Sequence, residues 1–157
     1  MMLQLNSAAF SNYETIPKRY TCHGENISPP LSWSDMPPGT ESLTLIVADP
    51  DVPNPAAPQR TWTHWVLYNI PPQAHGLPQG AGKKDLPKET QQGLNDWKET
   101  GYGGPCPPVG RHRYFFRLYA LDTVLKNLEK PTKKQLEAAM QGHILGWTEL
   151  VGTYQSP

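Results

Sequence analysis

Apolar and polar residues alternate most clearly at residues 42–48. Leu43, Leu45 and Val47 fall on one face of an extended chain, because successive side chains of a strand point to opposite sides. Prolines before and after this segment bound it as a strand. A second strand is predicted at residues 64–70, which are rich in aromatic and β-branched residues and are followed by two prolines.

A third strand is predicted at residues 113–121. Aromatic side chains occupy both of its faces, which indicates a strand buried on both sides. Shorter strand signals occur at residues 3–5 and 149–154. The pattern as a whole predicts a protein built mainly from β-strands.

Helical spacing is convincing only after Pro131. Thr132 and Gln135 have the spacing of a capping box, which favours a helix beginning there. The helix is expected to end at Gly146, and a weaker helical turn is expected near residues 87–92. The positions that recur at helical intervals are Leu136, Ala139, Met140, His143 and Ile144.

The composition fits one folded domain spanning residues 1–157. The 18 prolines and 13 glycines, together with five Trp and seven Tyr, are typical of a loop-rich β protein. The 14 basic and 14 acidic residues balance, which gives no electrostatic reason to expect nucleic acid as a partner. No stretch approaches the roughly 20 apolar residues of a membrane span.

The beginning of the chain and the cysteines bear on location. Residues 1–10 have neither the basic start nor the apolar run of a signal peptide, so a cytoplasmic location is expected. Cys22 and Cys106 can form only one pair. In a reducing compartment we expect both to remain free thiols.

Three segments carry the candidate chemistry. DPDVP at residues 49–53 ends the first strand, WTHW at 62–65 opens the second, and GYGGPCPPVGRHRY at 101–114 leads into the third. If these strands share a sheet, the three segments meet at one edge of it. The side chains that would meet there are Asp49, His64 and His112, between aromatic walls from Trp62 and Tyr114.

Such a cluster suits an anion. A carboxylate beside imidazoles raises their pKa and fixes their tautomers, so that they can donate hydrogen bonds. Backbone amides of the Gly-Gly-Pro turn at residues 103–105 would add further donors. Taken singly, each segment has an ordinary interpretation, since Asp-Pro-Asp commonly forms a turn and a histidine between tryptophans is commonly a half-buried structural residue.

In this order, the three segments resemble the signature of the phosphatidylethanolamine-binding protein family, also known through Raf kinase inhibitor proteins. YTCHG at residues 20–24 and ISPPLSW at 27–33 are similar to its bacterial and archaeal branch. The resemblance implies a large antiparallel sheet packed on a smaller one, few peripheral helices, and an anion pocket at one end. It assigns the pocket to Asp49, Trp62, His64, Gly104, Pro105, His112 and Tyr114.

Two features depart from the family pattern. The turn before His112 carries Cys106 and a pair of prolines, and the sequence ends at Pro157 without the C-terminal helix of eukaryotic members. A more open pocket is therefore expected, which argues against a preference for long-chain lipids.

Three classes of function are compatible with these residues. The favoured one is a binding module for a small phosphorylated or other anionic ligand, without a cofactor or a metal, and a regulatory role is compatible with it. The second is an enzyme in which the Asp49, His64 and His112 cluster holds a metal or acts as acid and base. The third is a module that binds a protein partner, such as a protease or kinase inhibitor. The sequence lacks a G-x-S-x-G motif and a Gly-rich phosphate loop, which argues against the enzyme.

Overall fold

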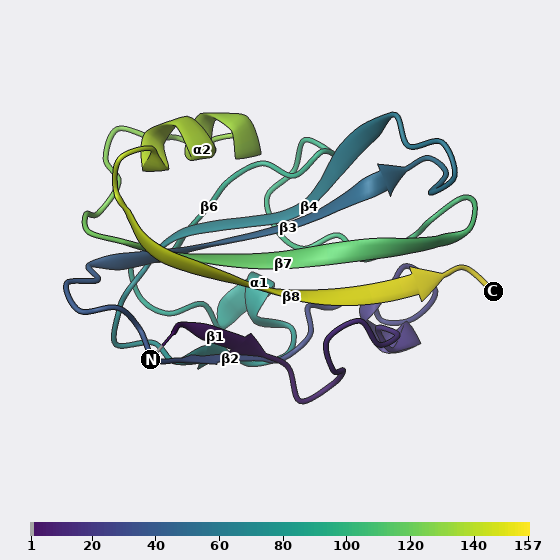
Figure 1. Cartoon of the computed structure of the whole chain (residues 1–157), viewed down its shortest axis with the longest axis horizontal. Helices are drawn as coiled ribbons and strands as arrows, with labels where there is room; N and C mark the ends of the chain where they lie inside the picture. Colours follow the sequence, from purple (N-terminus) through teal and green to yellow (C-terminus); the bar gives the residue numbers. More distant parts are fainter. Residues whose placement is uncertain (1) are drawn as a thin grey trace.

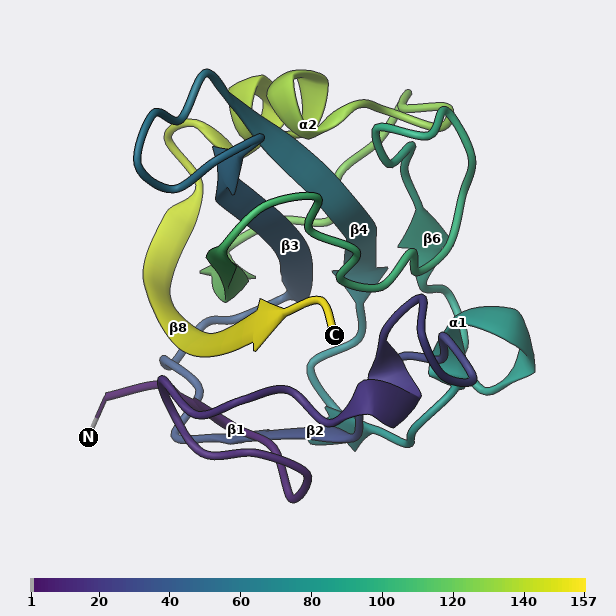
Figure 2. The same cartoon turned by 90° about the vertical axis from the view of Figure 1, so that its right-hand side faces the viewer.

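The computed structural model describes residues 2–157, apart from the side chain of Lys83, and shows two antiparallel sheets packed face to face (Figures 1 and 2). The large sheet has the spatial order β6 (Gln91–Gln92), β4 (Arg60–Ile70), β3 (Ser42–Val52), β7 (Arg111–Leu121) and β8 (Ile144–Gln155). The small sheet has the order β1 (Gln4–Asn6), β2 (Leu31–Ser34) and β5 (Gly76–Leu77). The expected fold, a large antiparallel sheet on a smaller one, is confirmed.

The main core lies between the two sheets. Leu45 and Val47 of β3 belong to it together with Leu5 and Trp33 of the small sheet. A second cluster lies on the outer face of the large sheet, where helix α2 (Lys133–Met140) covers it, as Figure 2 shows. Because β3 has apolar neighbours on both sides, nearly all of its residues are buried.

The strand expected to be buried on both sides is buried on only one. In β7 the residues from Tyr114 to Ala120 alternate between buried and half-buried positions. The half-buried face carries Arg113 and Arg117, whose guanidinium groups lie 5.4 and 5.0 Å from the centre of the Phe115 ring. Aromatic residues on this face therefore pack under arginine side chains, and β3 is the strand with two covered faces.

Helix α2 begins as the sequence predicts but ends earlier. Thr132 and Gln135 form the reciprocal capping box. The helix ends at Met140, and Gly142 then adopts a positive φ of 85°, which turns the chain toward β8. The prediction that the helix continues to Gly146 is wrong, because Ile144 already begins β8.

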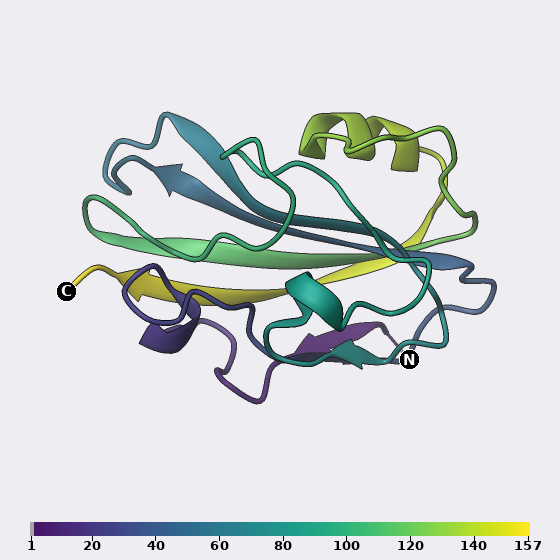
Figure 3. The same cartoon turned by 180° about the vertical axis from the view of Figure 1, so that it is seen from behind.

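The short strand expected at residues 3–5 is present as β1, but the short helical elements were not predicted correctly. The helical turn expected near residues 87–92 is instead a turn leading into β6. A single helical turn, α1 (Ala81–Lys84), lies earlier in the chain, and Figure 3 shows it from behind at a level between the two sheets. The remaining short element is the 3₁₀ turn η1 (Lys18–Tyr20), which follows β1 in the chain. No helix of the described residues has the length and apolar character needed to cross a membrane.

A disulfide joins Cys22, just after η1, to Cys106 in the loop before β7. The two Cα atoms lie 5.5 Å apart although 84 positions separate the cysteines in the sequence. The expectation of two free thiols is therefore wrong for this structure, because the fold packs the two loops against each other. The prediction of a cytoplasmic location loses the thiols as support and stays a prediction.

Candidate ligand-binding site

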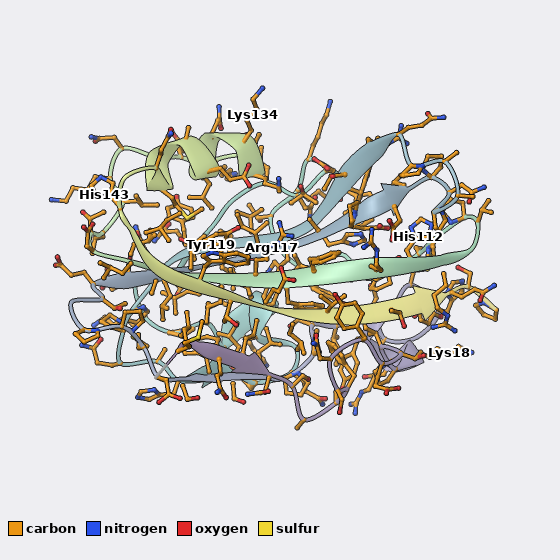
Figure 4. The ribbon with its side chains drawn as sticks, in the orientation of Figure 1. Lys18, His112, Arg117, Tyr119, Lys134 and His143 are labelled. Carbon is orange, nitrogen blue, oxygen red and sulfur yellow. A yellow bond between two sulfur atoms is a disulfide. The ribbon has the colours of Figure 1, made fainter. Side chains whose placement is uncertain are left out.

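The three segments singled out in the sequence meet at one end of the large sheet. Because β3 is antiparallel to both of its neighbours, its C-terminal end lies beside the beginnings of β4 and β7. Figure 2 views the molecule from this end, and Figure 4 shows His112 here, at the opposite end of the sheet from His143. The arrangement brings Asp49, Trp62, His64, His112 and Tyr114 around one pocket.

A β-bulge in β4 places the Trp62 side chain on the pocket side of the sheet. Trp65 and Thr63 oppose neighbouring residues of β3, which leaves His64 as an extra residue between them. One extra residue exchanges the two faces of a strand, because side chains alternate with a period of two. Trp62 therefore lies on the same face as Asp49, its partner in β3.

Asp49 and His112 form a buried pair in the pocket wall. Nδ1 of His112 lies 2.6 Å from Oδ2 of Asp49, and the residues are 0% and 2% exposed. Nε2 of His112 lies 2.8 Å from the carbonyl oxygen of Val109 and 3.1 Å from that of Pro53. Carbonyl oxygens only accept, so Nε2 carries a hydrogen and donates it.

One further proton occupies the short contact between His112 and Asp49. The pair is neutral overall whether that proton resides on the imidazole or on the carboxyl group. Burial raises the pKa of Asp49, and the hydrogen bond with His112 partly opposes this shift. Both ring nitrogens of His112 are engaged within the protein, so this residue shapes the pocket wall without offering it a free donor.

The second aspartate of the turn has a structural role. Asp51 binds the Arg113 side chain through both of its carboxylate oxygens, at 2.9 and 3.0 Å, and also accepts from the Arg113 amide. The Asp51 amide in turn donates to Oδ1 of Asp49 over 2.7 Å. The hydrogen bond from Arg113 keeps the pKa of Asp51 below its usual value. These contacts fix the end of β3 and with it the orientation of Asp49.

His64 is held by a backbone carbonyl and is neutral. Its Nδ1 donates to the Gly103 carbonyl oxygen over 2.6 Å, so Nε2 is the unprotonated nitrogen. Burial lowers the pKa of His64 to about 4. The expectation that Asp49 raises the pKa of His64 is wrong, because the imidazole that binds Asp49 is that of His112.

The lowered pKa of His64 predicts that acid destabilises the protein. A folded-state pKa near 4, against 6.5 for the unfolded chain, gives a stabilising contribution that is complete above pH 6.5 and is lost as the pH falls toward 4. The full loss is about 3 kcal/mol of the free energy of unfolding. Urea unfolding of the wild type and of His64→Asn between pH 4 and 7 measures it, since asparagine keeps a donor for the Gly103 carbonyl and does not titrate.

The quantity to compare is the difference between the two profiles. Asp49 acts in the opposite direction, because its raised pKa adds stability as the pH falls, and this contribution cancels in the difference. We expect the wild type to lose its advantage over His64→Asn steadily as the pH falls from 6.5 to 4. A constant difference over this range would show that the folded protein leaves the pKa of His64 unshifted.

Three polar atoms in the pocket wall have no hydrogen-bond partner within residues 2–157. They are Nε2 of His64, Nε1 of Trp62 and the hydroxyl oxygen of Tyr114, and each is buried. The pocket has a volume of about 360 Å³. Burial raises the pKa of Tyr114, and the nearby Asp49 charge adds to the shift, so its hydroxyl stays protonated and is able to donate. One acceptor and two donors therefore belong to residues that line the same pocket.

Two wall residues were missed in the sequence. Trp97 packs edge-on against both Trp62 and His64, with ring centres 5.5 and 5.1 Å apart. The exposed Arg60 lies with its guanidinium carbon 5.8 Å from the centre of the Trp62 ring and supplies a positive charge at the rim. Arg60 lies two positions before the WTHW segment, so extending that segment would have included it, whereas nothing in the local sequence marks Trp97.

The Gly-Pro turn has a different role from the one expected. The amide of Gly104 donates to Oδ1 of Asn26 over 2.8 Å, and the Pro105 carbonyl accepts from the amide of Cys22. A side chain at Gly104 would collide with the carbonyl oxygen of Tyr20, which explains the glycine. The prediction that the Gly104 amide is directed at a ligand is wrong, because that amide joins two loops.

A second hollow of about 440 Å³ lies at the other end of the large sheet, beside Ser42 and Asn69. Its two carboxylates, Glu41 and Glu89, are exposed. The smaller pocket is the stronger candidate, because it holds the buried Asp49–His112 pair and the unpartnered polar atoms.

Comparison with known proteins agrees with this architecture. Residues 6–155 match the family model described as phosphatidylethanolamine-binding protein. The chain belongs to the phosphatidylethanolamine-binding protein family. Within it, the chain is 51% identical over 156 residues to a "UPF0098 protein" of Methanothermobacter thermautotrophicus, covering 98% of this chain and 99% of the relative.

Two solved structures of family members superpose over nearly the whole chain. A phosphatidylethanolamine-binding protein homologue of Chlamydia trachomatis is 49% identical, with a TM-score of 0.91 and 99% of both chains covered. Escherichia coli YbcL, described as a member of the mammalian family, is 30% identical, with a TM-score of 0.89 and both chains covered completely. The resemblance inferred from the sequence motifs is thereby confirmed.

Proposed function

We propose that the protein is a binding module that captures a small anionic, phosphoryl-like group in the pocket at the end of β3. The observation that carries the proposal is that three residues lining one pocket, His64, Trp62 and Tyr114, each have a buried polar atom without a partner among residues 2–157. Buried polar groups are rarely left unsatisfied, so a ligand with both acceptors and a hydroxyl group suits this wall.

Each atom has a defined role toward a phosphate monoanion. The Trp62 indole and the Tyr114 hydroxyl donate to phosphate oxygens. Nε2 of the neutral His64 accepts from the P–OH group, a bond that a fully deprotonated phosphate does not offer. Arg60 supplies positive charge at the rim, and the neutral Asp49–His112 pair adds no net repulsion.

A binding role is supported over catalysis by the state of His112. An acid or base needs a nitrogen that exchanges its proton with the substrate, and both nitrogens of His112 bind protein atoms. Both carboxyl oxygens of Asp49 also bind protein atoms, so the enzyme alternative would rest on His64, a weak base with a pKa of about 4.

Titration with inorganic phosphate and with phenyl phosphate tests the proposal. We expect both to bind at pH 6 and to shift the NMR signals of the Trp62 indole and the His64 ring. Tyr114→Phe removes one donor to a charged group, so affinity should fall about tenfold or more. The matched control is Tyr119→Phe, which removes a hydroxyl from a half-buried tyrosine on the other face of β7.

The proposal fails if Tyr114→Phe and Tyr119→Phe bind phosphate equally well. It also fails if phosphate shifts signals around Ser42 and Asn69, at the larger hollow, and leaves the Trp62 indole unchanged.

A further inference from the structure

Beside the pocket, a cluster of three side chains within residues 2–157 has the composition of a metal site, and one of its members, Cys106, also lines the pocket. Cys22 and His23 follow η1, and Cys106 lies in the loop before β7. One sulfur from each cysteine and a ring nitrogen of His23 all lie within 4.8 Å of one another. The sequence predicts no metal, because it shows no ligand set beyond Asp49, His64 and His112; this cluster forms only when the two loops meet in the fold.

We propose that reduction of the Cys22–Cys106 disulfide converts this cluster into a Zn²⁺ site, with two thiolates and the His23 imidazole as ligands. Two cysteines and a histidine are a ligand set that zinc uses, and thiolates favour zinc over hard cations such as Mg²⁺ and Ca²⁺. The disulfide form offers no thiolate, so the site exists only in the reduced protein.

The spacing of the ligand atoms suits zinc. Zn–S and Zn–N bonds of about 2.3 and 2.0–2.1 Å place two tetrahedral ligands about 3.5 Å apart. Sγ of Cys22 lies 3.5 Å from Nδ1 and 3.8 Å from Nε2 of His23. The two sulfurs need to separate to about 3.8 Å, which rotation of the cysteine side chains provides after reduction.

His23 is already oriented by a second residue. Its Nδ1 lies 3.0 Å from the Tyr154 hydroxyl, and the two rings pack with centres 5.9 Å apart. When Nδ1 donates to Tyr154, Nε2 is free to ligate the metal. Metal-binding histidines commonly hold their other ring N–H in such a bond. His23 and Cys106 are exposed, which leaves the fourth coordination position to water.

The ligands remain close together without the covalent bond. The Cys22 amide donates to the Pro105 carbonyl over 3.1 Å, and the Tyr102 hydroxyl donates to the Tyr20 carbonyl over 2.7 Å. The Gly104 amide adds a third hydrogen bond between the same two loops. Zinc therefore binds a largely preformed site in the reduced protein and gains affinity from that preorganisation.

A phosphine supplies the two electrons that reduce the Cys22–Cys106 disulfide. The phosphine attacks the disulfide, and water then gives its oxygen to phosphorus and its two protons to the sulfurs. The products are one phosphine oxide and two thiols. Zn²⁺ then displaces the two thiol protons as it binds, so its affinity rises with pH.

Cobalt(II) is the probe for the experiment, because thiolate ligands give it intense charge-transfer bands in the near ultraviolet. We expect the phosphine-reduced protein to bind one Co²⁺ per chain with these bands, and Zn²⁺ to displace it. The oxidised protein and the Cys22→Ser/Cys106→Ser variant should show no such bands.

His23→Gln should bind Zn²⁺ at least tenfold more weakly than the reduced wild type. The matched control is His143→Gln, which removes an exposed histidine at the far end of the sheet (Figure 4) and should bind as the wild type does. Near-ultraviolet circular dichroism of every reduced sample checks that the native packing is kept.

Three results would overturn the proposal. They are the lack of a thiolate–cobalt band in the reduced wild type, equal zinc affinity in His23→Gln, and loss of the native dichroism on reduction. Phosphate binding in the pocket is measured separately, so either proposal can fail while the other stands.

Discussion

Replacing Asp49 with alanine is expected to lower the free energy of unfolding by about 3–5 kcal/mol. The substitution removes one partner of a pair that is almost wholly buried, and His112 is held in place by two carbonyl oxygens on its other side. Its Nδ1 would then have no hydrogen-bond partner at a position that water does not reach. Urea unfolding at pH 7 measures the loss.

Asp49→Asn is the matched control, and it should lower the free energy of unfolding by only about 1 kcal/mol. The asparagine oxygen can still accept from the Asp51 amide, and its NH₂ group can donate to Nδ1 of a neutral His112. His112 would keep its Nε2 hydrogen bonds to the carbonyl oxygens. Equal losses in the alanine and asparagine variants would contradict this account of the pair, since they would show that a neutral donor cannot replace the carboxyl group.

Removing the disulfide with Cys22→Ser/Cys106→Ser should lower the free energy of unfolding by about 4 kcal/mol. The bond spans 84 positions of the chain, and closing a loop of this length restricts the unfolded ensemble by roughly that amount. For a protein of this size the loss corresponds to a fall in melting temperature of about 8–16 °C. Thermal and urea unfolding without metal ions measure both quantities.

The control for the disulfide uses a reductant with the same two proteins. A phosphine should destabilise the wild type to about the level of the serine variant and leave that variant unchanged. The contrary result is that reduction leaves the stability of the wild type unchanged although the serine variant has a lower free energy of unfolding. In that case the serine side chains cause the lower stability. The chain-entropy explanation would then be wrong.

The long strands β3, β4 and β7 could be predicted from the sequence because each shows a clear pattern, whereas only residues 149–154 of β8 were predicted. The alternation at residues 42–48 identified β3, and the aromatic run at 113–121 identified β7. The strands β5 and β6 have two residues each, which is too few for any period to show, and they form only because a neighbouring strand offers its edge. Tertiary contact decides such elements.

The convergence of the pocket residues followed from the antiparallel order of β4, β3 and β7, but their pairing did not. Whether Asp49 binds His64 or His112 depends on side-chain directions that the sequence does not contain. The disulfide was missed for a similar reason, since Cys22 and Cys106 meet only after two distant loops have packed.

The bulge at His64 determines which residues of β4 line the pocket. Along β4, the core takes an odd-numbered residue, Trp65, and the pocket takes an even-numbered one, Trp62. A designer who grafts the pocket onto another sheet must therefore transfer the extra residue as well as the side chains. Without it, the indole of Trp62 would turn to the opposite face. At this position the number of residues, as much as their identity, defines the binding surface.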